Sequence, residues 1–495
     1  GDICHTLRSK ADMHAIHCSV GMATGAALFP LQDTAVTLDV DIPLAKELRR
    51  THHMSMPREE WSEALAPAAQ LEVPDRHIAF LYRAALHSLV LLSAEDIVPG
   101  PFTYKRFWFR DACLMLHAML CTGLTDRCHR ILDTFPGRQK FSGYFQSQEG
   151  EWDSNGQVLW LADRFRRLTG RELGQEWTEA VRKATDWIER KRVTDSENAP
   201  HEGLLPAGFS AEHFGPNDYY YWDDFWAQAG LEAGARIYRA QGQTQEASTC
   251  EQRAEALAQA IRTSLDSIAA ERKQGALPAS PYRRLDSGAI GALVADYPLG
   301  LTAARDSEIG ATAEYLYQNC LLNGGFFQDM IHSGINAYLT LCLAQTLLRR
   351  DDARFQELVQ AVADLATSTG QWPEAIHPLT LGGCMGDGHH GWAAAEWVMM
   401  LRNMFVREEE DELILGSGIF PEWFEAGEPL GFGPTLTPYG QIQVRFVPAH
   451  ETWQVHIEAR WHVEKPPHLT IRAPGFQPCN VTDTTQPVTL QAEQT

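Results

Sequence analysis

Two stretches of the sequence concentrate carboxylic acids in surroundings that suit acid–base chemistry. The stretches "HEGLLPAGFSAEHFGPNDYYYWDDFW" and "QWPEAIHPLTLGGCMGDGHHGW" together supply Glu202, Glu212, Asp218, Asp223, Asp224, Glu374 and Asp387. Hydrolysis of a glycosidic bond uses two such groups, one protonated toward the leaving oxygen and one ionised to activate water or to attack the anomeric carbon. Glu212 lies in mid-loop with no helix end to cap, and Glu374 follows a proline that stiffens the chain before it. Asp223 and Asp224 begin a predicted helix, where capping of free N–H groups is an equal alternative.

Aromatic rings stand beside carboxylate, amide and guanidinium groups in the same and neighbouring loops. This mixture suits a sugar, because ring faces stack on C–H surfaces while fixed polar groups pair with hydroxyls. The candidate sugar-binding residues are Trp108, Arg110, Asp111, Trp152, Asp153, Tyr221, Trp222, Asp223, Arg283, Arg284, Trp372 and His390. We predict no metal site, because three-ligand spacing is absent and the adjacent His389 and His390 would point in different directions on a helix. We expect no other cofactor.

The composition restricts the partners that the chain can have. Its 42 Lys and Arg against 64 Asp and Glu give a formal net charge of -22, which argues against nucleic acid or an anionic membrane as a partner. No apolar run approaches the ~20 residues that span a bilayer. The 10 cysteines include no CxxC pair, and the first residues lack the layout of a signal peptide, so we expect a cytoplasmic protein.

Most of the elements that position these residues are predicted to be helices. Apolar residues recur at helical spacing in roughly twelve segments, among them 75–94, 109–123 and 286–297, with Pro74-Asp75 as a helix start. Tight turns alternate with long loops, and long loops are usually functional. We therefore predict a mainly α fold, an (α/α)6 toroid of six helical hairpins over 75–408, with the long loops and the site at one end.

The remaining segments are predicted to be strands or a linker. Residues 1–50 are predicted to be a β-rich segment, of the kind that belongs to a larger sheet domain, and 51–74 a linker. Residues 409–495 contain alternating strands such as "GQIQVRFVPA" and "TWQVHIEARW", separated by Pro and polar turns. This pattern predicts a small C-terminal β-sandwich that serves packing.

The helical region and its loops resemble the six-hairpin glycosidases, especially the glucoamylase-like group. The Trp-x-Arg-Asp motif of that group, at the head of a helix, is matched by Trp108, Arg110 and Asp111, and the resemblance implies that the Arg-Asp pair holds hydroxyls of the terminal sugar. The alternative for this pair is a salt bridge between helices. "EWDSNGQVLWLADRFRRLTG" resembles the segment at the head of the fourth helix, and "RRLDSGAIGAL" the segment before the eighth, where an arginine often touches substrate.

The same resemblance implies the two catalytic roles. The general acid lies between helices five and six and the general base between eleven and twelve, which by loop position are Glu212 and Glu374. "WPEAIHP" matches the base motif, whereas the acid loop lacks the usual Trp-Glu pair, so Glu202, Asp218 and Asp223 remain rivals. An inverting, exo-acting hydrolase of α-linked glucosides or related sugars follows, with carboxyl groups roughly 6.5–9.5 Å apart.

Two other functions remain open from the sequence. An inverting phosphorylase would use Arg283, Arg284, His389 and His390 to hold phosphate, which arginine binds in bidentate fashion. A barrel that binds glycans without cleaving them is the other. The acidic residues in both loops argue against the non-catalytic reading.

Overall fold

The computed structural model describes residues 61–194, 198–209, 215–330 and 333–493. Contacts divide the chain into Gly1–Ala64 and Leu65–Thr495. Of the first unit only α2 (Trp61–Ala64) is described. The predicted β-rich segment 1–50 and the candidate acid Glu212 therefore lie outside the described residues, and the following account concerns the second unit.

Six helical elements form a closed ring. They are α4 (Phe109–Cys121), α7 (Ser154–Thr169), α9 (Tyr221–Ala240), the 3-10 helix η1 (Ser287–Ala295), α13 (Ala337–Arg349) and α15 (Gly391–Phe405). Each contacts the next in this order, and α15 contacts α4. Every residue of α4 and of α15 is buried, as expected for helices that are covered on all sides. We call these six elements the inner ring.

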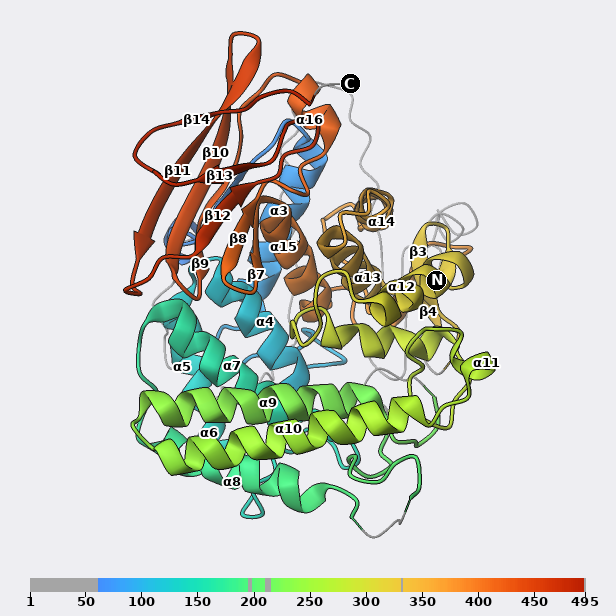
Figure 1. The fold of residues 1–495 in the computed structure, drawn as a ribbon. Helices are drawn as coiled ribbons and strands as arrows, with labels where there is room; N and C mark the ends of the chain where they lie inside the picture. Colours follow the sequence, from blue (N-terminus) through green and yellow to red (C-terminus); the bar gives the residue numbers. More distant parts are fainter. Residues whose placement is uncertain (1–60, 195–197, 210–214, 331–332, 494–495) are drawn as a thin grey trace, which may run out of the picture. The chain divides into compact units, whose positions relative to one another are not determined.

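The remaining helices cover the inner ring from outside. They are α3 (Arg76–Leu91), α5 (Thr125–Leu132), α6 (Phe135–Arg138), α8 (Glu176–Lys191), α10 (Thr244–Asp266), α11 (Ala270–Lys273), α12 (Ser307–Asn319) and α14 (Phe355–Asp364). The longer ones are amphipathic: α8 buries Trp177, Val181, Ala184 and Ile188, one face at helical spacing. The four-residue α11 buries none of its residues. Figure 1 shows α10 lying beside α9 along most of its length. Among the described residues, no helix is both long and apolar enough to cross a lipid bilayer.

The mainly helical prediction is confirmed, with one local difference. Asp75 caps α3 by accepting hydrogen bonds from the N–H groups of His77 and Ile78, as the helix start at Pro74-Asp75 predicts. The segment predicted as a helix over 286–297 is instead the 3-10 helix η1. Its sequence "SGAIGALVA" is apolar throughout and contains two glycines, so it offers little intrinsic preference for an α-helix.

Two sheets are formed by β1, which precedes the ring helices, and by strands that follow them in sequence. One has the order β1-β9-β10-β11-β14 and the other β13-β12-β8-β7. Their strands are β1 (Gln70–Glu72), β7 (Val406–Glu409), β8 (Glu412–Leu415), β9 (Leu430–Thr437), β10 (Gly440–Ala449), β11 (Thr452–Trp461), β12 (His468–Ile471), β13 (Cys479–Val481) and β14 (Val488–Thr489), with α16 (Pro421–Glu425) between β8 and β9. β1 lies within the predicted linker 51–74 and pairs antiparallel with β9. β7 spans the predicted boundary at 408, so the last inner helix runs directly into the sheet region.

A small third sheet lies mostly within two of the predicted long loops, 321–331 and 369–387, and its strand at 334–335 occupies the start of the predicted helix 332–350. Its strands are β2 (Leu321–Leu322), β3 (Gly325–Gln328), β4 (Gly334–Ile335), β5 (Ala375–Ile376) and β6 (Gly383–Met385), in that order. Glu374 immediately precedes β5, whose Ala375 pairs with Met385. The candidate base is therefore attached to a hydrogen-bonded sheet and not to an unsupported loop.

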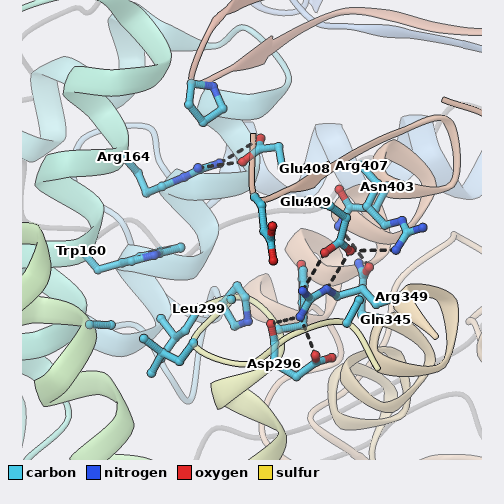
Figure 2. Close-up of a pocket in the computed structure, with 18 of the residues that line it drawn as sticks. Trp160, Arg164, Asp296, Leu299, Gln345, Arg349, Asn403, Arg407, Glu408 and Glu409 are labelled. Atoms are coloured by element: carbon cyan, nitrogen blue, oxygen red, sulfur yellow. Dashed lines mark hydrogen bonds and ion pairs between the residues drawn. The ribbon is translucent and has the colours of Figure 1, made fainter. Parts of the chain in front are cut away.

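A cavity of about 460 Å³ lies where several inner helices end. It is lined by the later turns of α7, α13 and α15, by the segment 296–304 after η1, and by the β7 hairpin. Figure 2 shows Arg349 between Asp296 and Glu409, to which it binds at 2.5 and 2.8 Å. Glu408 binds Arg164 at 2.8 Å and Arg402 at 2.7 Å. We call this group of charges the arginine network.

Candidate active site

The N-terminal ends of four inner helices converge on the predicted site residues. Arg110 and Asp111 lie in the first turn of α4, Asp153 directly precedes α7, Asp223 lies in the first turn of α9, and His390 directly precedes α15. All are buried, with exposed fractions between 0% for Asp153 and 7% for Arg110. The sequence motifs, which are distant along the chain, therefore meet at one end of the inner ring.

Arg110 lies between two carboxyl groups. Its Nη1 atom is 3.5 Å from Glu151 Oε2 and 3.5 Å from Asp153 Oδ2. Charge-assisted N–H···O contacts are usually about 2.7–2.9 Å, so neither carboxylate holds the guanidinium tightly. Glu151 immediately precedes the predicted residues Trp152 and Asp153, and sequence reasoning missed it.

Asp153 joins helices α7 and α9. Its Oδ2 atom accepts hydrogen bonds from Trp222 Nε1 at 3.0 Å and from Gln157 Nε2 at 3.0 Å. Its Oδ1 atom and the Oδ1 atom of Asp223 have no hydrogen-bond partner among the described residues. Buried acceptors of this kind cost free energy unless a ligand or water satisfies them, so they are suited to hydroxyl donors.

Asp111 faces His390 across the mouth of the inner ring. His390 Nε2 is 3.8 Å from Asp111 Oδ1, and the His390 ring packs against Tyr338 with 5.0 Å between centroids. Burial, together with the charge of Arg110, lowers the pKa of His390 to about 3. Its imidazole is therefore neutral at ordinary pH, and its buried Nδ1 atom has no hydrogen-bond partner among the described residues.

Glu374 is buried beside this cluster and receives a hydrogen bond from the hydroxyl of Tyr104. Burial raises its pKa, and the Tyr104 hydroxyl and the Arg110 charge offset only part of that rise. Gly386 makes the close approach possible: it has φ +68°, and a Cβ atom there would lie 3.0 Å from Glu374 Oε2. Tyr104 was not predicted, although it precedes the aromatic cluster at 107–109.

Asp387, the other carboxylate of this loop, is engaged by backbone. Its Oδ2 atom accepts from the N–H groups of Phe102 and Tyr104, both at 3.0 Å, and its Oδ1 atom from that of Thr103 at 2.7 Å. Burial opposes ionisation of Asp387, but these three donors outweigh burial and lower its pKa. Asp387 therefore remains ionised and has little capacity left for acid–base chemistry.

Carboxyl groups outnumber guanidinium groups around Arg110, and their pKa values rise accordingly. Burial, reinforced by neighbouring carboxylates, raises the pKa of Asp111 to about 6 and that of Glu151 to about 7. The same causes raise the pKa of Asp223 well above its usual value. The site thus holds protonated and ionised carboxyl groups side by side near neutral pH. Within the described ranges, no group of three His, Cys, Asp or Glu side chains is arranged to hold a metal ion.

The loop that contains Glu212 is anchored at both of its described ends. Gly208 and Asp218 exchange backbone hydrogen bonds at 3.0 and 3.2 Å, and Asp224 Oδ1 accepts from the N–H of Leu205 at 2.8 Å. Glu212 lies outside the described residues, between these anchors. Of its rivals, Asp218 accepts from Ser280 Oγ at 2.7 Å and from the N–H of Tyr219 at 2.8 Å, so it is engaged in supporting the loop.

Several predicted sugar-binding residues do not join the cluster. The Tyr221 hydroxyl contacts Ser264 Oγ of α10 at 2.8 Å, on the outer side of α9. Trp372 is fully buried and donates to the carbonyl of Val362 at 2.8 Å, so it packs in the core. Arg283 pairs with Asp286 at 2.6 Å, while Arg284 is exposed.

The two tryptophans of the candidate site carry cations on their ring faces. The Arg106 guanidinium carbon lies 3.5 Å from the Trp108 ring centroid, and Lys191 Nζ lies 3.9 Å from that of Trp152. Cation–π contacts of this kind stabilise the exposed cation and fix the ring. Each ring therefore has one face already covered.

The sequence matches no protein-family model and no curated protein. Solved structures resemble it in fold. A structure named as a glycosidase is 17% identical, with a TM-score of 0.52, over 67% of this chain and 98% of the other. A GH78 family rhamnosidase of Bacillus sp. GL1 is 16% identical with a TM-score of 0.59, over 82% of this chain and 43% of the other. The glucoamylase from Saccharomycopsis fibuligera is 10% identical with a TM-score of 0.52, over 69% and 97%.

These likenesses agree with the resemblance in the sequence. About two thirds of this chain, 67% and 69%, matches nearly the whole length of two of these structures. At this identity the likeness concerns the fold. The chain therefore has a six-hairpin, glucoamylase-like glycosidase fold, and its site residues lie at the end of the inner ring where the long loops gather.

Proposed function

We propose that this protein is an inverting glycoside hydrolase with an (α/α)6 barrel fold. It releases terminal sugars from α-linked glucosides or related substrates. The observation that carries the proposal is Glu374, a buried carboxyl group held by Tyr104 beside the Arg110 cluster. The substrate class follows from the likeness to glucoamylases and from a similar glycosidase structure in complex with glucose, with a TM-score of 0.50.

Glu374 is the proposed general base. A base must be ionised to take a proton from water, and burial works against ionisation. The hydroxyl of Tyr104 and the charge of Arg110 both favour the ionised form. Activity should therefore rise with pH as Glu374 ionises, with a midpoint above the usual glutamate value.

Glu212 is the proposed general acid, by its place in the loop anchored at Gly208 and Asp218. Among its rivals, Asp223 lies in the cluster around Arg110. Asp223 is buried, and its raised pKa favours the protonated form that a general acid needs. Replacing each separately by its amide distinguishes them: the true acid loses most with substrates that have poor leaving groups, since these need protonation most.

Arg110 and Asp111 are proposed to bind hydroxyls of the terminal sugar. Asp153, which contacts Arg110, and Asp223 each have a buried Oδ1 atom without a hydrogen-bond partner among the described residues, and this favours hydroxyl binding over a purely structural salt bridge. A double-mutant cycle on Arg110 and Asp111, measured with and without sugar, tests it. Coupling of equal size in both states would assign the pair to structure.

Proton NMR of the product anomer tests the reaction itself. We expect a panel of α-linked disaccharides to release a free β-anomer, with or without phosphate. A sugar phosphate would establish a phosphorylase, although Arg283 is already paired with Asp286 and His390 is neutral. Release of the α-anomer would establish retention, and absence of any product would favour a glycan-binding protein.

The variant Glu374→Gln tests the base. General bases contribute about 10²–10⁴-fold, so kcat should fall within that range while sugar binding persists. The matched control is Glu396→Gln, a buried glutamate of α15 whose pKa burial raises to about 7 and which binds Trp392 and Tyr297. Full activity in Glu374→Gln would remove the residue from the mechanism.

A further inference from the structure

The segment 99–104 is hydrogen-bonded at two places to the chain around the start of α15. The Pro99 carbonyl accepts from the N–H of Gly391 at 2.7 Å, and Asp387 accepts from the three successive N–H groups of residues 102–104. We call this arrangement the Asp387 clamp. It places a single carboxylate where three backbone donors of one loop converge.

The clamp leaves no room for a side chain at either of two neighbouring glycines, Gly100 and Gly386. A Cβ atom at Gly100 would lie 2.3 Å from Asp387 Oδ2, so the loop backbone touches the carboxylate directly. At Gly386 an added Cβ would lie 2.8 Å from Tyr104 Cε2. Gly100 and Gly386 therefore allow the clamp to pack closely against the Tyr104 side chain, whose hydroxyl reaches Glu374.

The clamp ends on the residue that contacts the proposed base. The N–H of Tyr104 donates to Asp387, and the hydroxyl of the same Tyr104 donates to Glu374. Fixing the backbone of Tyr104 fixes the origin of the long side chain whose hydroxyl donates to Glu374. Phe102, by contrast, is 78% exposed, so the clamp does not serve to bury that neighbouring side chain.

We propose that Asp387 is a positioning residue: its carboxylate fixes the 102–104 backbone so that the Tyr104 hydroxyl donates to Glu374 and keeps this base ionised. The inference rests on the proposed role of Glu374. Asp387 itself touches no reacting atom and acts through Tyr104.

Other charged groups bear on the same two residues and must be held constant. Arg110 favours ionised Glu374, while Asp111 and Cys384 interact with it unfavourably when they are charged. His390 senses the charge of Asp387 but remains neutral. None of these groups is altered in the variants below.

The test is a double-mutant cycle on Asp387→Asn and Tyr104→Phe, read from the pH dependence of kcat/KM. An amide offers one acceptor oxygen to three donors, so Asp387→Asn should open the clamp. In each single variant the acidic limb of the pH profile of kcat/KM should shift to higher pH by about one unit. Each variant should also lower kcat more than it raises KM. In the Tyr104→Phe background Asp387→Asn should move the limb no further, because its route to Glu374 is already gone.

Asp306→Asn is the matched control. Asp306 also accepts from two backbone N–H groups, those of Glu308 and Ile309, at the start of α12. This variant should lose stability without moving the acidic limb. Additive limb shifts in the cycle, or an unmoved limb in Asp387→Asn, would overturn the positioning role.

A measurement without substrate separates this inference from the proposed function. Amide hydrogen exchange of the segment 99–108 should be at least about tenfold faster in Asp387→Asn and unchanged in Tyr104→Phe. Unchanged exchange in Asp387→Asn would overturn the clamp even in an active enzyme. Faster exchange in a protein that cleaves no glycoside would uphold the clamp and reject Glu374 as a base.

Discussion

At the end of the inner ring where the helices begin, carboxyl groups gather around the guanidinium of Arg110; at the end where they finish, guanidinium groups gather around Glu408 and Glu409. The contacts differ in length, 3.5 Å from Arg110 to its carboxylates against 2.5–2.8 Å in the arginine network. The pKa values differ in direction. Burial raises the pKa of Glu151, whereas Arg164 and Arg402 overcome the burial of Glu408 and lower its pKa far below the usual value.

Helix polarity explains part of this difference. Cations are favoured at helix C-termini, where Arg349 and Arg402 end α13 and α15, and each finds a carboxylate on the β7 hairpin. Anions are favoured at helix N-termini, where Asp111 and Asp223 lie. Among the described residues, Glu151, Asp153 and Asp223 each have a buried carboxylate oxygen without a hydrogen-bond partner where we propose that substrate binds, whereas Asp296 is the one carboxylate of the arginine network with such an oxygen.

The largest effect on this comparison is expected from Glu408→Gln. It leaves the buried guanidiniums of Arg164 and Arg402 without their shared carboxylate and should cost roughly 2–4 kcal/mol of unfolding free energy. The value is below that of a fully buried pair because 21% of the Glu408 side chain is exposed. Urea unfolding measures the loss, and Glu410→Gln, exposed on the same hairpin, is the control. Equal stability of the two variants would show that the arginine network contributes little.

Arg110→Met tests the opposite end. Without the guanidinium the surrounding carboxyl groups repel one another more strongly and retain protons, and the proposed hydroxyl donor is lost. We expect kcat/KM to fall about 10²–10³-fold, with the acidic limb displaced upward. Steady-state kinetics from pH 4 to 9 measure both changes. A fall without displacement would mean that Arg110 binds sugar but does not influence Glu374.

Glu151→Gln should stabilise the protein at alkaline pH. A carboxyl group whose folded pKa is raised stabilises the fold below its unfolded pKa, near 4.5, and loses this contribution as pH rises through its folded pKa of about 7. At pH 8 the variant should therefore gain on the order of 1–3 kcal/mol over wild type. At pH 5 the gain should largely vanish. A gain that does not depend on pH would point to packing instead of charge.

The smallest effect is expected from His390→Gln. Because His390 is neutral above its pKa of about 3, removal of the imidazole changes hydrogen bonding and packing but no charge. We expect kcat/KM to fall about tenfold, with both limbs of the pH profile unmoved. Displacement of either limb by more than half a unit would show that His390 titrates in the working range.

The sequence predicted the helices better than the contacts among their side chains. The sequence predicted α3 and α4 with their starts, because Asp75 caps α3 and the polar pair Arg110-Asp111 lies in the first turn of α4. Helical spacing overextended into η1, which has no polar face, and it missed the two-residue strands β2, β4 and β5, which are too short to alternate.

At the site, motif position predicted more reliably than residue type. Arg110, Asp111 and Asp153 converge because each begins an inner helix. Tyr221 and Trp372 were predicted from aromatic character alone, and the structure uses both in packing. Tyr104 and Asp387 act through a backbone arrangement formed by segments nearly 300 residues apart, which no local pattern reveals.

The pairing of β1 with β9 limits how this protein can be divided. The strand just before the first outer helix is completed by a strand more than 350 residues later, and Thr435 of β9 also binds the carbonyl of Cys121 at the end of α4. A chain shortened at 408 would expose the edge of β1 and remove the carboxylate that Arg349 and Arg407 share on Glu409. The inner ring is therefore not a transplantable module, and any chimera that keeps it must also carry the sheet that β1 and β9 form together.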